Sequence, residues 1–152
     1  MHRTPYNDDY ETCDKTHAEL RIYSGELSPR EVSLRLGIEP TVMNEKGKTR
    51  ISITTGRERV LPLNLWLLSS EGHLHSKDLR RHLDWLLDQI EPAAAALREL
   101  EQLPDATMNV HCSWWSAHGH GGPTLWPQQM RRVAALNLEL AFEIMFLGDD
   151  EQ

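Results

Sequence analysis

Two histidines and three glycines lie within the stretch SAHGHGG at residues 116–122. His118 and His120 form a His-x-His pair, and imidazole nitrogens are common zinc ligands. His73 and His75 form a second pair, so two converging loops would bring four nitrogens to one metal ion. No cysteine, aspartate or glutamate stands at ligand spacing beside either pair. We therefore expect no cofactor, with zinc at His118 and His120 as the alternative.

The same loop offers a second chemistry, the binding of an anion. Glycines let backbone N–H groups converge, and the loop leads into PQQMRRVAAL, whose apolar spacing predicts a helix with a partly positive N-terminus. The loop lacks the lysine of a phosphate-binding loop, and Pro123 and Pro127 remove two N–H donors. A simple turn also explains Gly119, Gly121 and Gly122, because glycine adopts positive φ without strain.

Nucleophilic or acid–base catalysis has weaker support in the sequence. Cys112 falls on the apolar side of an alternating segment, which indicates core packing rather than a reactive thiolate. His111 and Ser113 share the opposite side, but that placement defines no catalytic triad. Glu139 and Glu143 fit a solvated or interface surface better than an acid/base pair.

Alternating and helical patterns predict the elements that position these residues. Ser28, Pro29 and Glu31 have the spacing of a capped helix start, and Gly37 ends that helix. A longer helix begins near Ser76, and proline at position 92 kinks or divides it. The remaining elements are strands at about 18–23, 61–67, 107–115 and 138–146, a helix at about 127–136, and a possible hairpin within 51–60.

These elements predict an α+β fold with a single domain. Two βαβ units, which share a weak internal repeat, are joined by the long helix and form a mixed sheet of four to five strands with helices on one face. We expect a mobile polar leader at 1–16, the domain at 17–147 and an acidic tail at 148–152. The side chains expected to face the helices include Leu61, Leu63, Leu65 and Leu67 of the second strand and Leu138, Leu140, Phe142, Ile144 and Phe146 of the last.

The other face of this sheet has no helix to cover it. It combines aromatic, charged and histidine side chains, which suits binding or self-association. The alternative is that the irregular stretch from Glu39 to Arg59 folds back over it. The residues expected on this face are Arg21, Tyr23, Asn64, Trp66, His111, Ser113, Trp115, Glu143 and Met145.

Composition narrows the environment and the partners. A net charge of −7, with basic residues scattered among acidic ones, disfavours nucleic acid and permits a basic protein partner. No apolar run is long enough to span a membrane and no secretory signal is evident, so we expect a cytoplasmic protein that does not bind membranes. Cys13 and Cys112 lie in unlike contexts and are expected to be free thiols.

The order of several short motifs also carries a family resemblance. AELRIYS, LGIEPT, LWLLSS, DLRRHLDWLLDQIEP, VHCSWWS, GHGGPTLWP and LELAFEIMF, spread over about residues 17–147, together resemble the bacterial domain-of-unknown-function family 4279. The resemblance implies a small cytoplasmic bacterial protein, and proteins of this kind often serve as immunity or accessory factors. It supplies no catalytic residues.

We therefore predict a non-enzymatic protein-binding module of an immunity-like or regulatory kind, acting on a protein partner or by self-association. The predicted binding surface comprises Tyr23, Trp66, His111, Trp115, Gly119, Gly121 and Gly122. The alternative is a metal- or anion-dependent enzyme that uses the loop at 116–122.

Overall fold

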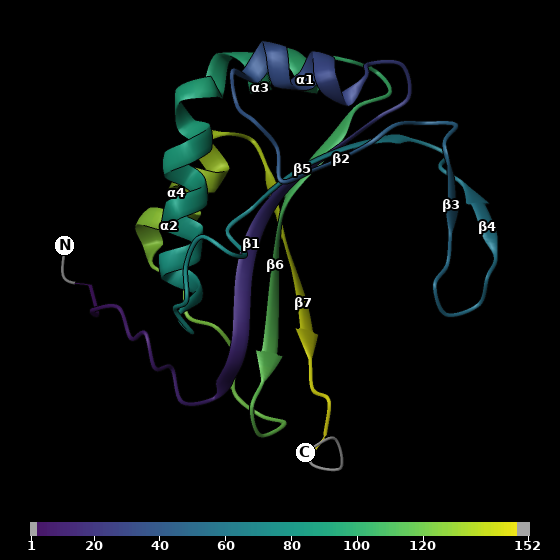
Figure 1. Ribbon diagram of the computed structural model, residues 1–152. Coiled ribbons are helices and arrows are strands. Elements are labelled where there is room, and N and C mark those ends of the chain that lie inside the picture. Colours follow the sequence, from purple (N-terminus) through teal and green to yellow (C-terminus); the bar gives the residue numbers. More distant parts are fainter. Residues whose placement is uncertain (1–2, 149–152) are drawn as a thin grey trace.

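A computed structural model describes residues 3–148, so parts of the predicted leader and acidic tail, residues 1–2 and 149–152, lie outside the described residues. The fold is α+β, as the sequence predicts. Its main sheet has five strands in the order β2-β5-β1-β6-β7, and a separate hairpin forms a second, two-stranded sheet (Figure 1). The main strands are β1 (Cys13–Ser24), β2 (Val42–Asn44), β5 (Asn64–Ser69), β6 (Thr107–Ser116) and β7 (Glu139–Met145); the hairpin strands are β3 (Thr49–Ile51) and β4 (Glu58–Val60).

The second predicted βαβ unit is present, whereas the strand predicted to end the first unit, at about 61–67, runs antiparallel to β1. In the second unit, β7 follows helix α4 (Pro127–Ala135) and pairs directly with β6 in parallel. In the first unit, helix α1 (Pro29–Leu36) leads to β2, which runs parallel to β1 but is separated from it by β5. The predicted second strand is therefore β5, an antiparallel strand inserted between β1 and β2.

The helices begin and end where local chemistry predicts. Ser28 accepts a hydrogen bond from the Glu31 backbone at 3.2 Å, and Gly37 ends α1 with a φ of 68°. The long helical segment divides near its proline into α2 (Leu79–Ile90), a short 3-10 turn η1 (Glu91–Ala93) and α3 (Ala94–Glu101).

The core lies between the sheet and the helices. Leu20 and Ile22 of β1 and Val110 and Cys112 of β6 pack there against α2, where Leu83 and its neighbours are fully buried. Leu86, Leu87, Ile90, Leu97 and Leu100 complete the helical side of this core. No helix among the described residues is long and apolar enough to cross a membrane.

The orientation of β5 corrects one prediction. Trp66 pairs with Ile22 and is buried in the core at 1% exposure, with Leu68 beside it in the cluster. Leu65 and Leu67, predicted to face the core, therefore point to the opposite face, and Trp66 does not belong to the exposed surface. Its indole nitrogen donates a hydrogen bond to Ser33 Oγ at 2.9 Å, which fixes α1 against the sheet.

A second correction concerns β7. Leu138 is buried as expected, but Phe142, Ile144 and Phe146 are exposed at 44%, 52% and 47%. Phe142 and Ile144 do point to the helix side, since they lie in register with Cys112 and Trp114. Helix α4 meets this edge of the sheet without covering the far half of the strand.

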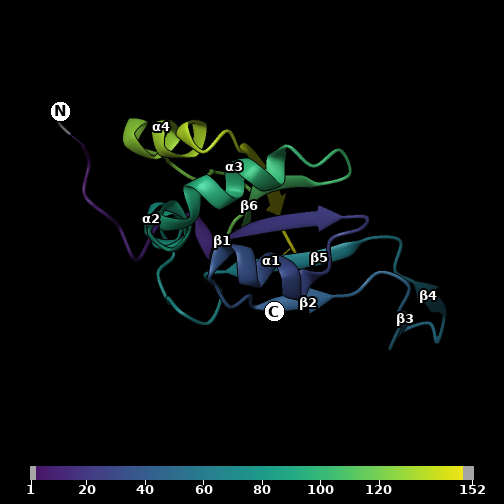
Figure 2. The same ribbon diagram turned by 90° about the horizontal axis from the view of Figure 1, so that it is seen from above.

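The first strand extends further toward the N-terminus than its alternating pattern indicated. The first strand starts at Cys13, several residues before the predicted domain start at 17. Residues 3–12, here called the strap, run along the N-terminal end of α2 at one end of the molecule, while the β3–β4 hairpin projects at the other end (Figures 1 and 2).

Candidate functional site

The open face is defined here as the face of the main sheet that points away from the helices. Residues 45–60, which include the β3–β4 hairpin, are all exposed to solvent and lie to one side of the sheet (Figure 1). This segment therefore does not cover the open face. The alternative in which the stretch from Glu39 to Arg59 folds back over that face is not what the structure shows. Tyr23, His111 and Trp115 of the predicted binding surface lie on this face, together with Arg21, Ser113, Glu143 and Met145.

A row of charged and polar side chains crosses the open face from β1 to β7, and it is called here the polar cluster: Glu19, Arg21, His111 and Glu143. Arg21 Nε donates a hydrogen bond to Glu19 Oε1 at 2.9 Å. The same carboxylate oxygen lies 3.6 Å from His111 Nδ1, and His111 Nε2 lies 3.6 Å from Glu143 Oε2. Glu19 was not singled out by the sequence because an isolated glutamate in an alternating strand predicts only a solvated position.

Electrostatics keep His111 neutral near pH 7. Its pKa is lowered below the usual value mainly by burial and further by the Arg21 guanidinium, while Glu19 and Glu143 oppose the shift. A neutral imidazole at 3.6 Å from each carboxylate makes neither a strong ion pair nor a short hydrogen bond. This arrangement brings two carboxylates, a guanidinium and a neutral imidazole together on one face.

Side chains around Trp115 on the open face pack against one another, which limits their exposure to solvent. His17 lies beside the Trp115 ring with centroids 5.4 Å apart, and Lys15 Nζ sits 4.9 Å from the centre of that ring while pairing with Glu71 at 3.0 Å. His17 Nδ1, His111 Nδ1 and Asn109 Oδ1 are nevertheless buried without a hydrogen-bond partner. Such groups are costly unless a partner satisfies them, so this face holds unused hydrogen-bonding capacity.

The glycine loop has a structural explanation. Ser116 Oγ donates to the His120 carbonyl at 2.9 Å and accepts from the Gly119 backbone at 2.8 Å. Gly119 and Gly121 adopt φ values of 86° and 88°, whereas Gly122, also predicted in this conformation, does not. A side chain at Gly121 would overlap Thr12, so this glycine also permits close contact with the chain just before β1.

The loop histidines do not form a metal centre with other side chains of residues 3–148. His118 and His120 are exposed and stack on each other with ring centroids 5.9 Å apart. His73 instead stacks on Trp85 at 4.7 Å. Within the described range, no group of three or more histidine, cysteine, aspartate or glutamate side chains is arranged to hold a metal ion.

Neither cysteine is a reactive thiol. Both are free and buried, with Cys112 in the core as predicted and Cys13 at the start of β1. Burial raises the pKa of Cys13 to about 11 and that of Cys112 to about 12. Both side chains therefore remain protonated at physiological pH and act as small apolar groups.

A buried serine–histidine pair was missed by the sequence analysis. Ser70 Oγ lies 2.7 Å from His82 Nδ1, and His82 Nε2 lies 2.7 Å from the Ser76 carbonyl. The carbonyl requires Nε2 to carry the proton, so Nδ1 accepts from the Ser70 hydroxyl. Ser70 is fully buried and no carboxylate orients the ring, so the pair is structural.

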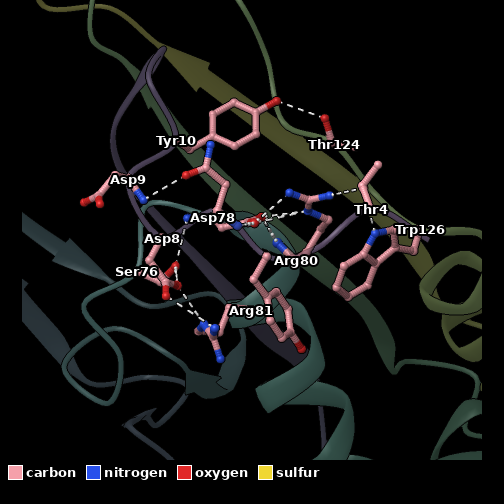
Figure 3. Close-up of polar contacts among 12 residues, drawn as sticks. Thr4, Asp8, Asp9, Tyr10, Ser76, Asp78, Arg80, Arg81, Thr124 and Trp126 are labelled. Atoms are coloured by element: carbon pink, nitrogen blue, oxygen red, sulfur yellow. Dashed lines mark hydrogen bonds and ion pairs between the residues drawn. The ribbon is translucent and has the colours of Figure 1, made fainter.

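The strap was also missed, because its contacts join residues far apart in the sequence. Asp78, the cap of α2, is fully buried, accepts from the Asn7 backbone at 2.6 Å and pairs with Arg80 at 2.8 Å. Arg80 Nη1 and the Trp126 indole both donate to Thr4 Oγ1, and Asp8 pairs with Arg81 (Figure 3). These bonds join the strap to the start of α2 and to the loop before α4.

The Tyr10 hydroxyl connects the strap to the glycine loop. It donates to the Gly122 carbonyl at 2.8 Å and lies 2.9 Å from Thr124 Oγ1 (Figure 3). Tyr10 thus joins the strap to the loop, in which the His120 and Gly122 carbonyls and the Gly119 N–H bond within the molecule.

Fold and site together define an α+β protein with one sheet face covered by helices and the other open, bearing a partly unsatisfied polar cluster. The chain matches the domain-of-unknown-function family DUF4279 over residues 14–147. It belongs to this family, which confirms the resemblance seen in its short motifs. No curated protein and no solved structure matched the chain.

Proposed function

We propose that this protein acts by binding another protein through its open face, as an immunity-like or regulatory module. The observation that carries the proposal is the polar cluster on a sheet face without a covering layer. The partly exposed Trp115 ring, with the exposed Glu143 carboxylate at the rim of the same face, fits a protein interface in which an aromatic side chain is flanked by charge.

Charge favours a basic partner over a second copy of the chain. The protein carries a net charge of −7, and Glu143 at the rim of the polar cluster is 55% exposed and lies 3.6 Å from the neutral His111. A lysine or arginine of the partner would form an ion pair with this carboxylate. The opposite charges would also increase the rate at which the partner associates. The alternative of a metal- or anion-dependent enzyme at residues 116–122 has less support, because no group of three or more histidine, cysteine, aspartate or glutamate side chains within residues 3–148 is arranged to hold a metal ion.

The test begins with native mass spectrometry of the protein purified from the organism that encodes it, with and without chelator. We expect a stoichiometric protein partner that the Trp115→Ala variant no longer retains. Leu34→Ala is the matched control, since Leu34 is 72% exposed on α1, away from the open face. Retention of the partner by Trp115→Ala, or a metal whose removal changes the partner's occupancy, would contradict the proposal.

A further inference from the structure

The outer edge of β7 is an unpaired strand edge within the described part of the chain. β7 stands last in the strand order and pairs only with β6, in parallel, from Asn109 opposite Glu139 to Trp115 opposite Met145. Figure 1 shows no further element beyond it on that side. Such an edge presents backbone N–H and C=O groups that another strand can pair with.

The two sides of this edge differ in chemistry. On the helix side, Phe142 and Ile144 are exposed at 44% and 52%, although their register neighbours Cys112 and Trp114 are fully buried. Natural edge strands are usually protected by charge, proline or a covering element. Here the helix side of the strand carries exposed apolar surface that continues to Phe146 and Leu147, which is typical of an interaction site.

On the open-face side, the same strand presents carboxylates. Glu139 and Glu143 are both exposed, and they flank Ala141 at alternate positions of the strand. β7 therefore shows apolar side chains to one side and acidic side chains to the other. Because side chains alternate along a strand, a partner strand would have to match both surfaces with the same period of two.

We propose that the outer edge of β7 binds an extended segment of a partner protein as an added strand in which apolar and basic residues alternate. Backbone hydrogen bonds would extend the sheet. The segment's apolar side chains would cover Phe142 and Ile144, and its lysines or arginines would lie beside Glu139 and Glu143. This goes beyond the proposed function, since a partner could contact Trp115 and the polar cluster without adding a strand.

Charge argues against a second copy of β7 as the occupant. In antiparallel self-pairing, a register centred on Ala141 places Glu139 opposite Glu143, and one centred on Glu143 places that residue opposite itself. A register centred on Phe142 leaves the two Glu143 carboxylates on a diagonal. Like charges at these positions destabilise strand pairing, and two acidic chains also repel each other.

The experiment uses a blocked peptide of alternating valine and lysine with seven residues, the length of β7, and measures its binding to the full chain by fluorescence anisotropy. We expect saturable binding together with slowed hydrogen–deuterium exchange of β7. Two control peptides are matched to it. One carries N-methyl groups on alternate amides, which blocks strand pairing, and the other has the same composition with the lysines grouped together.

Protein variants separate the two surfaces. Phe142→Ser with Ile144→Ser should weaken peptide binding by about tenfold. Glu139→Lys with Glu143→Lys should reverse the preference in favour of a valine–glutamate peptide. Trp115→Ala, which tests the open face, should leave peptide affinity within about twofold, so that failure of this inference and failure of the proposed function are distinguishable.

Three results would overturn the inference. Equal binding of the N-methylated or the regrouped peptide would show attraction without strand addition. Equal binding of the valine–glutamate peptide to the unaltered protein would remove the role of the glutamates. A concentration-dependent dimer that already protects β7 from exchange would assign the edge to a second copy of the chain.

Discussion

Replacement of Trp66 by alanine distinguishes the core from the open face most sharply. Trp66 is 1% exposed, contacts the core between the sheet and α1, and donates to Ser33 Oγ at 2.9 Å. Removing a buried indole of this kind destabilises a domain by about 3–5 kcal/mol, from lost burial and the cavity left behind. The Ser33 hydroxyl also loses its partner, although it lies on a partly exposed helix and can turn to water.

Trp115→Ala is the matched variant, since it removes the same side chain from the other face of the sheet. Trp115 is partly exposed and contacts His17 and Lys15 at the surface. Its removal should reduce the free energy of unfolding by about 1 kcal/mol.

Urea unfolding followed by circular dichroism measures both effects. With a slope of about 2 kcal/mol per molar urea, Trp66→Ala should lower the midpoint by about 2 M and Trp115→Ala by about 0.5 M. The urea midpoint of Trp66→Phe should fall between those of the two alanine variants, because phenylalanine keeps most of the packing but loses the hydrogen bond to Ser33. Equal midpoint shifts for the two alanine variants would refute the assignment of Trp66 to the core.

Two further predictions concern buried ionisable groups, and a third concerns a glycine in a turn. Burial lowers the pKa of His82 and His111 below the ordinary 6.5, so that the unfolded chain binds protons at a higher pH than the folded protein does. The free energy of unfolding should therefore decline as the pH falls below about 6.5. His82→Gln should make this decline less steep, as measured by urea unfolding at several pH values. Asp78→Ala should lower stability by about 3–5 kcal/mol by leaving Arg80 buried and unpaired, and adding Arg80→Met should restore part of the loss in thermal unfolding. Gly121→Ala should destabilise the protein more than Gly72→Ala in the same assay, because both glycines have positive φ but only Gly121 would overlap Thr12.

The sequence predicted those elements whose local signals agree. The capped start of α1, the division of the long helix near its proline and the alternation of β6 all follow from spacing within a few residues. In β6 the polar and apolar positions differ clearly, so His111 and Trp115 could be placed on the open face in advance.

Other features depended on partners that no local pattern reveals. The run LNLWLLSS is apolar at both parities, and only pairing with β1 and the size of the indole decide that Trp66 faces the core. The alternation of β7 gave the correct side for Phe142, but not whether a helix covers it. The strap has no period at all, because its structure depends on Asp78 and other residues distant in the sequence.

Hydrogen–deuterium exchange of the complex with the captured partner tests the central claim most directly. Binding through the open face predicts that exchange slows in the strands that carry the polar cluster, above all β6 and the middle of β1, while α2 and α3 behind the sheet stay unchanged. Protection confined to the helices or to the loop at 116–122, with β6 unchanged, would contradict the account.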